Sequence, residues 1–171
     1  MTERSSPALG LSRLLLRLVV IFNRAIAAIL AACFAGTFVF HDQVIHYFQR
    51  RAFDSAILMP ALRIWMILAV PYIGAVHVML TRLLEMVETV RLGNPFVPEN
   101  AVRLKTIAWC LLATQLLHLV FGLMVRIAAS ANAHMEWKFS ANGWIAVLLL
   151  FVLARVFEEG TRIRDDLEKM I

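Results

Sequence analysis

Residues 18–40 read LVVIFNRAIAAILAACFAGTFVF, an apolar run in which Arg24 is the only charged residue. A helix needs about 20 apolar residues to cross the ~30 Å hydrocarbon core of a bilayer. Similar runs follow at 56–80, 107–129 and 141–157, of which the last is the shortest. In lipid, every backbone N–H and C=O must be bonded within its own segment, so each run is predicted to be a helix. The sequence therefore predicts an all-α, polytopic membrane protein with four transmembrane helices.

The composition favours a membrane protein over a soluble one. Hydrophobic residues make up 61% of the chain and the mean hydropathy is +0.75, whereas a soluble domain is roughly half apolar. The formal net charge is +5, but the basic residues are scattered over helix ends and form no cluster that could follow a phosphate backbone. We therefore expect the lipid bilayer as a partner and no direct contact with nucleic acid. Residues 1–171 are expected to form one domain.

Lys and Arg residues near the ends of the apolar runs predict the orientation, because cytoplasmic connections of membrane proteins are enriched in them. They are frequent in the N-terminal tail, the second connection and the C-terminal tail: Arg4, Arg13, Arg17, Arg82, Arg91, Arg103, Lys105, Arg155, Arg162, Arg164 and Lys169. The other two connections contain mainly Arg50, Arg51 and Lys138. The sequence thus predicts that both termini lie in the cytoplasm.

The predicted helices span about residues 11–40, 56–92, 98–129 and 141–168. Apolar periodicity continues past the second run to Leu92, so this long helix should extend about 15 Å into the cytoplasm. Gly93 suits a left-handed backbone after a helix, and Pro98 suits the first position of the next one. Residues 93–97, which we call the elbow, then join the two helices. Residues 41–55 are charged and aromatic, and we favour a solvated loop there over an amphipathic segment at the interface.

Polar side chains inside a membrane are costly, so they are candidates for function. Helical spacing places several on one stripe of each of the first three helices, and a bundle would turn these stripes inward, with Gly74 and Gly122 allowing close approach. The candidate intramembrane polar layer consists of Arg24, Arg63, His77, His118, Glu158 and Glu159. We expect Arg24 to pair with Glu85, Glu158 or Glu159, and Arg63 to share an outer layer with His118.

Two interpretations of these polar groups remain open. They either set the helix register and extend to water, or form a path for protons or a ligand. The first is favoured because no Asp or Glu lies within the apolar runs. Haem ligation by His77 and His118 is not expected, since they differ in depth by about 10 Å.

No enzymatic activity, catalytic residue, cofactor or metal is expected. No Cys/His cluster has the spacing of a metal site, and Cys33 and Cys110 lie inside apolar runs, where a disulfide is not expected. Glu158 and Glu159 resemble the paired glutamates of intramembrane CAAX-type proteases, but the companion histidine motifs of those proteases are absent.

Two segments carry a resemblance to a known family. Residues 93–100 read GNPFVPEN and are followed by Val102-Arg103-Leu104, while residues 157–160 read FEEG and are followed by Arg162, Asp165 and Asp166. They resemble the elbow and the closing segment of domain-of-unknown-function family 2975, small bacterial membrane proteins with four predicted helices. Relatives often have Ser or Thr at the position of Val97, which cannot cap the next helix. The resemblance implies a bacterial inner-membrane location, multi-pass.

The resemblance also implies a partner, because members are often encoded beside a small helix-turn-helix repressor. We therefore expect a regulatory or binding module that engages a small cytoplasmic DNA-binding regulator. The candidate docking residues are Phe96, Glu99, Asn100, Asp165, Asp166 and Glu168. Acidic residues there suit a basic partner, since anionic lipid would repel them; Phe96 either docks or packs beneath its own loop. The alternative function is a small transporter or channel component with an intramembrane polar pathway.

Overall fold

The computed structural model describes residues 7–50, 55–93, 95–129 and 137–169, in which every regular element is a helix. The helices are α1 (Pro7–Val39), α2 (His41–Arg50), α3 (Ser55–Arg91), α4 (Pro98–Ala129) and α5 (Ala141–Glu168). Of these, α1, α3, α4 and α5 are long and apolar enough to cross a membrane, which confirms the four predicted spans. The length and composition of its helices therefore indicate a multi-pass membrane protein.

The helix α2 corrects one prediction, because residues 41–50 form a helix where a solvated loop was favoured. Asp42 lies in its first turn and Arg50 in its last, and both charges complement the helix dipole. Its junction with α1 keeps the helical bonding pattern: the N–H of Phe40 donates to the carbonyl of Gly36 (2.9 Å), and that of Val44 to Phe40 (3.0 Å).

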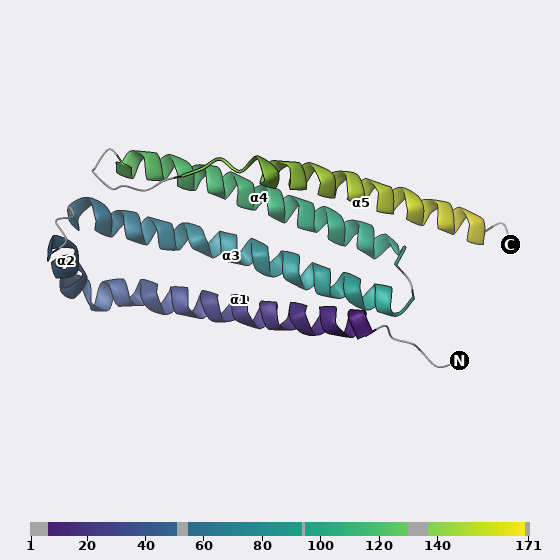
Figure 1. Ribbon diagram of the computed structural model, residues 1–171, viewed down its shortest axis with the longest axis horizontal. Helices are drawn as coiled ribbons and strands as arrows, with labels where there is room; N and C mark the ends of the chain where they lie inside the picture. The colour runs from purple at the N-terminus through teal and green to yellow at the C-terminus, as the bar shows by residue number, and fades with distance from the viewer. Residues whose placement is uncertain (1–6, 51–54, 94, 130–136, 170–171) are drawn as a thin grey trace.

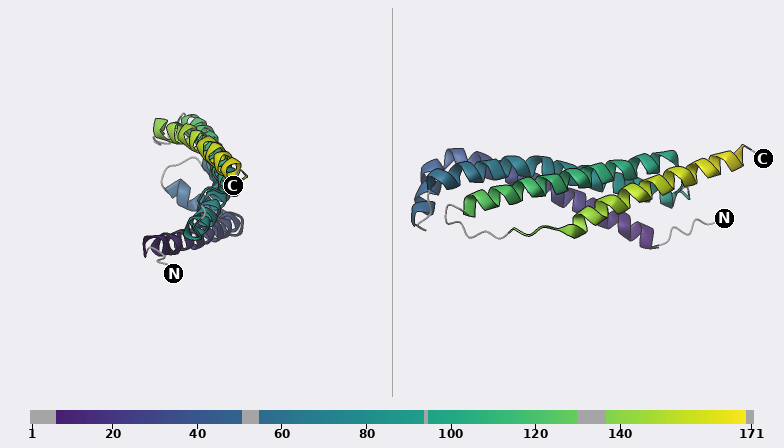
Figure 2. Two further views of the ribbon diagram at one scale, coloured as in Figure 1. Left: turned by 90° about the vertical axis from the view of Figure 1, so that its right-hand side faces the viewer. Right: turned by 90° about the horizontal axis from the view of Figure 1, so that it is seen from above.

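The four long helices lie side by side in the order of the sequence (Figure 1). Among the described residues, α1 contacts α3, α3 contacts α4 and α4 contacts α5, while α1 does not reach α4 or α5. Viewed end-on, they follow one another in a curved, open row (Figure 2). Small buried residues of α4 and α5, such as Ala101, Ala108 and Ala154, let neighbouring helices approach closely.

The elbow and both ends of the described chain lie at one end of this row, and α2 lies at the other (Figure 1). We call these the elbow end and the α2 end. The 37 residues of α3 span about 55 Å at 1.5 Å per residue, more than the hydrocarbon core requires. Gly93 follows α3 with φ of +81°, the left-handed conformation that was predicted for it.

Three polar contacts set the antiparallel register of α1 and α3. Near the elbow end, Arg13 Nε lies 3.3 Å from Glu88 Oε2. Further along, Asn23 Nδ2 donates to the carbonyl of Ile73 (3.3 Å). Towards the α2 end, Arg63 Nη2 donates to the carbonyl of Thr37 (3.0 Å). From the first contact to the last, the residue number rises by 24 along α1 and falls by 25 along α3, so the two helices stay paired over most of their length.

Candidate functional site

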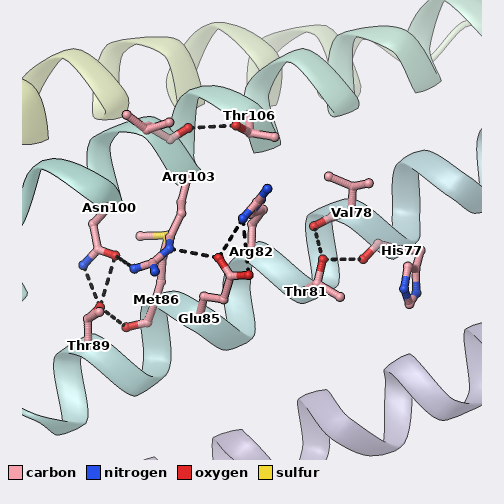
Figure 3. Close-up of polar contacts among 11 residues, drawn as sticks. His77, Val78, Thr81, Arg82, Glu85, Met86, Thr89, Asn100, Arg103 and Thr106 are labelled. Atoms are coloured by element: carbon pink, nitrogen blue, oxygen red, sulfur yellow. Dashed lines mark hydrogen bonds and ion pairs between the residues drawn. The ribbon is translucent and has the colours of Figure 1, made fainter.

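Asn100 is the centre of the elbow, and it is fully buried in the first turn of α4. Its Nδ2 donates to the carbonyl of Pro95 (2.9 Å) and to Thr89 Oγ1 (2.8 Å) of α3. Its Oδ1 accepts from Arg103 Nη1 (2.8 Å), as Figure 3 shows together with the Thr89 contact. One amide thus connects the turn to both helices that it joins. The predicted docking role of Asn100 is wrong because this side chain is inaccessible.

A charged cluster continues this network along α3 (Figure 3). Arg103 Nε donates to Glu85 Oε2 (3.0 Å), and Arg82 Nη1 lies 2.9 Å from the same oxygen. Two guanidinium groups share one carboxylate, so the cluster carries a surplus positive charge. Glu85 is therefore engaged within the α3–α4 pair.

Phe96 connects the elbow to α5. Its ring centroid lies 5.4 Å from that of Phe157, and a Cβ added at Gly160 would lie 3.5 Å from Phe96 Cδ1. Phe96 nevertheless remains 45% exposed. Part of the ring packs against α5 and part remains accessible, so the same side chain holds α5 and is open to a partner.

A groove of about 640 Å³ separates the first turns of α4 from the last turns of α5 at the elbow end. Its charged lining residues are Lys105, Arg155, Glu158, Arg162, Asp166 and Lys169. Glu158 pairs with Arg155 (3.1 Å). Asp166 is exposed among these basic side chains, whereas the side chains of Asp165 and Glu168 lie outside the described part of the structure. The described lining therefore carries both signs of charge.

The structure places the remaining docking candidates at this same end. Glu99 is exposed in the first turn of α4 and lines a smaller groove of about 350 Å³ with Arg82 and Arg103. Phe96, Glu99 and Asp166 are thus accessible together at the elbow end. Thr89 was not singled out from the sequence, because only the return of α4 along α3 brings it to Asn100.

The predicted polar layer does not form one interior. Arg24 and His77 line a common groove between α1 and α3, but α1 does not contact α5, so Arg24 cannot reach Glu158 or Glu159. Glu158 instead pairs with Arg155, and Glu159 is exposed. The expected Arg24–carboxylate pair is therefore wrong for α5, and Glu85 is taken by Arg82 and Arg103.

Arg63 and His118 also lie apart. Arg63 turns towards the end of α1, where its guanidinium lies 4.1 Å from the Phe38 ring centroid and Nη2 lies 3.4 Å from His41 Nδ1. The His118 ring stacks near Trp137, with centroids 5.6 Å apart.

The glycines behave differently from the prediction of close helix approach. A Cβ at Gly122 would collide with the Trp137 side chain, and one at Gly74 would meet open space. The Gly122 side of α4 thus faces the chain that leads into α5, whereas the polar residues of α3 divide between two neighbours: Arg63 and Glu88 contact α1, and Glu85 contacts α4. Within the described ranges, no three His, Cys, Asp or Glu side chains gather to hold a metal ion.

Comparison with known proteins agrees with the elbow and closing segments. No curated protein and no solved structure matches the chain. A family model described as protein of unknown function (DUF2975) matches residues 54–171, which include α3, the elbow, α4 and α5. The match covers more than half of the chain and leaves α1 and α2 outside it. This protein therefore belongs to the DUF2975 family.

Proposed function

We propose that the protein is a multi-pass protein of the bacterial inner membrane that binds a small cytoplasmic helix-turn-helix regulator at its elbow end. In this proposal both termini face the cytoplasm, as the distribution of Lys and Arg suggests. The protein acts by binding and not by catalysis. In the cell, this binding would hold the regulator at the membrane, and its loss would release the regulator.

The exposed face of Phe96 is the observation that carries this proposal. An aromatic ring fixed in one position loses little side-chain freedom on binding, which is why aromatic anchors are common at the centre of interfaces. The buried Asn100 network and the contact with Phe157 supply that fixed position. Leu92, just before the elbow, is 67% exposed and extends the apolar surface. Both lie at the end of α3, which is longer than a bilayer requires.

Charge around the elbow adds to the argument. The tail residues Asp165, Asp166 and Glu168 gain nothing from an anionic membrane surface. In the proposal, a basic partner binds them in competition with the basic side chains that surround Asp166 in its groove. Complementary charges at the rim of an interface mainly raise the association rate and orient the partner. In the proposal, Phe96 supplies affinity and the acidic tail supplies orientation.

Two phenylalanine variants separate docking from packing. The measurement is retention of a neighbouring-gene helix-turn-helix regulator by the purified protein in mild detergent. Phe96→Ala removes both the exposed part of the ring and its contact with Phe157. Phe157→Ala removes only the contact and leaves the Phe96 ring in place. We expect Phe96→Ala to weaken retention by about tenfold or more, and Phe157→Ala to change it by less than about threefold. Equal effects would mean that Phe96 only holds α5 in place.

Charge reversal tests the acidic tail independently. Asp165→Lys combined with Asp166→Lys should abolish retention of the regulator while membrane insertion and expression persist. Asp42→Lys is the matched control, because Asp42 is exposed in α2 at the opposite end of the row. If the double variant still retains the regulator, the acidic tail has no role in binding it.

A further inference from the structure

A long apolar groove lies between α1 and α3, within the membrane spans and away from the elbow. Its volume is about 820 Å³. One wall follows α1 from Asn23 through Ala27 and Ala31 to Phe34, and the other follows α3 from Met66 through Val70 and Gly74 to His77. Each wall covers eleven residue steps, or about 16 Å at 1.5 Å per residue. The groove exists because small residues face each other, and a Cβ at Gly74 would meet nothing within 4 Å.

The groove is polar at one end only. Asn23, Arg24 and His77 lie at the end nearer the elbow, while Phe34 and Met66 lie at the end nearer α2. Asn23 is buried and bonded to the carbonyl of Ile73. The lining therefore changes from cationic and hydrogen-bonding to wholly apolar along its length.

Two groups at the polar end lack partners. His77 Nδ1 is buried and has no hydrogen-bond partner, and Figure 3 shows the ring directed away from the Glu85 cluster towards α1. Arg24 has no carboxylate partner among the described residues, because Glu85, Glu88 and Glu158 are engaged by other arginines. About 20 residues of α1 cross the core, which places Arg24 about 6 Å inside it when counted from Val39. A cation at that depth is costly without a counter-ion, and buried polar nitrogens normally have a partner.

We propose that this groove binds a single-chain anionic amphiphile, a long-chain carboxylic acid, with its carboxylate at Arg24 and His77. The guanidinium donates to the carboxylate, and His77 Nδ1 shares a hydrogen bond with it according to its tautomer. The alkyl chain runs along Ala27, Ala31 and Val70 towards Phe34. This orientation matches that of a fatty acid in the leaflet nearer the elbow.

The depth of Arg24 favours a carboxylic acid over a phospholipid. A phospholipid phosphate sits in the headgroup region, whereas the groove has its charged residue below the surface. The inference does not depend on the proposed docking partner, because no groove residue belongs to the elbow or to α5.

The test uses the full chain in nanodiscs of phosphatidylcholine, a zwitterionic lipid. The probe is spin-labelled stearic acid, and the measurement is the immobilised fraction of its electron paramagnetic resonance spectrum as oleic acid competes. We expect a saturable immobilised fraction that oleic acid displaces and that methyl oleate displaces at least about tenfold more weakly. Arg24→Gln should weaken binding by about tenfold or more, which corresponds to loss of one charge-assisted contact.

Matched variants distinguish this site from general lipid contact. Arg17→Gln removes the same charge from the same helix outside the groove and should leave binding unchanged. Ala31→Trp fills the groove and should abolish the immobilised fraction. Because Arg24→Gln could disturb folding, His77→Phe provides a second variant that keeps an aromatic ring and should also weaken binding; helicity and monodisperse elution are checked for each.

Three results would overturn the proposal. The first is equal immobilisation of the acid by the wild type, Arg24→Gln and Ala31→Trp. The second is equal competition by oleic acid and methyl oleate. The third is Arg24-dependent immobilisation of spin-labelled phosphatidylglycerol without that of the acid, which would assign the groove to a membrane phospholipid.

Discussion

At the scale of single residues, Asn100 has the largest structural role in the elbow. Replacing it with Ala would leave the half-buried carbonyl of Pro95 and Arg103 Nη1 without this partner, although Arg103 Nε keeps its bond to Glu85. Each such unsatisfied group costs about 1–3 kcal/mol. We therefore expect Asn100→Ala to lower the free energy of unfolding by at least about 2 kcal/mol, measured by thermal unfolding in detergent.

Thr106→Ala is the control for that measurement. The Thr106 hydroxyl donates to the carbonyl of Val102 at an exposed position of α4, so its loss should change stability by less than about 0.5 kcal/mol. Equal stability of the two variants would contradict the central role of Asn100.

Asn100 also illustrates what single residues in the sequence do not reveal. Its place in the GNPFVPEN segment suggested an accessible docking residue, and Phe96 in the same segment is indeed exposed. The difference arises from Thr89, eleven residues earlier, whose hydroxyl meets Asn100 only because α4 returns along α3. Periodicity identifies the face of a helix but not the side chain that a neighbouring helix brings to it.

At the scale of elements, two glycines make a matched pair. Gly93 has φ of +81° after α3, whereas Gly36 lies within α1 with open space around its Cα. A Cβ in the left-handed conformation costs about 1–2 kcal/mol, so Gly93→Ala should lower the melting temperature. Gly36→Ala should keep or raise it, because Ala is favoured over Gly in a helix by about 0.5–1 kcal/mol. Melting curves in one detergent compare them, and a destabilised Gly36→Ala with an unaffected Gly93→Ala would refute this account.

The element bounds follow closely from local sequence signals where those signals are strong. The predicted bounds of α4 (98–129) and α5 (141–168) agree with the observed ones, and Pro98 marks the first residue of α4. The helix α1 begins at Pro7, earlier than predicted, at a residue that fits the first helical position. The missed helix α2 also had a signal, since Asp42 and Arg50 complement its dipole at opposite ends. The charged residues of this segment favoured a solvated loop in the prediction. A short polar segment is equally compatible with a helix, so the charges alone could not decide between the two.

At the scale of the whole molecule, the open row could not be predicted from the polar stripes. Lipid is as apolar as a leucine side chain, so helices in a membrane have no hydrophobic reason to close into a ring. Arg63 bonds the carbonyl of Thr37 and lies over the Phe38 ring of α1, and His118 lies against Trp137, so these two side chains find contacts in neighbouring segments and not with each other. Local satisfaction of this kind removes the need for a shared interior.

Cross-linking distinguishes the row from a closed bundle. In a chain with Cys33→Ala and Cys110→Ala, the pair Arg13→Cys and Glu88→Cys should react with a short thiol-to-thiol reagent, because these side chains meet at 3.3 Å. The pair Arg13→Cys and Glu158→Cys should not, since α1 and α5 do not touch. Cross-linking within one chain is read by mobility on a denaturing gel after cleavage between α1 and α3, which separates residue 13 from both partner positions. Efficient linkage of the second pair would establish a closed arrangement.

The row has a consequence for how the molecule assembles. Among the described residues, every contact between helices joins elements that are adjacent or nearly adjacent along the chain. During synthesis, each new span therefore finds its docking surface already in the membrane, and little loop-closure entropy is lost at each step. A nascent chain released after α4 would hold every contact that α1, α3 and α4 make with one another. In a closed ring the first and last helices could pack together only after synthesis of the last one. In this protein each long helix can pack against the preceding long helix as soon as it has been inserted.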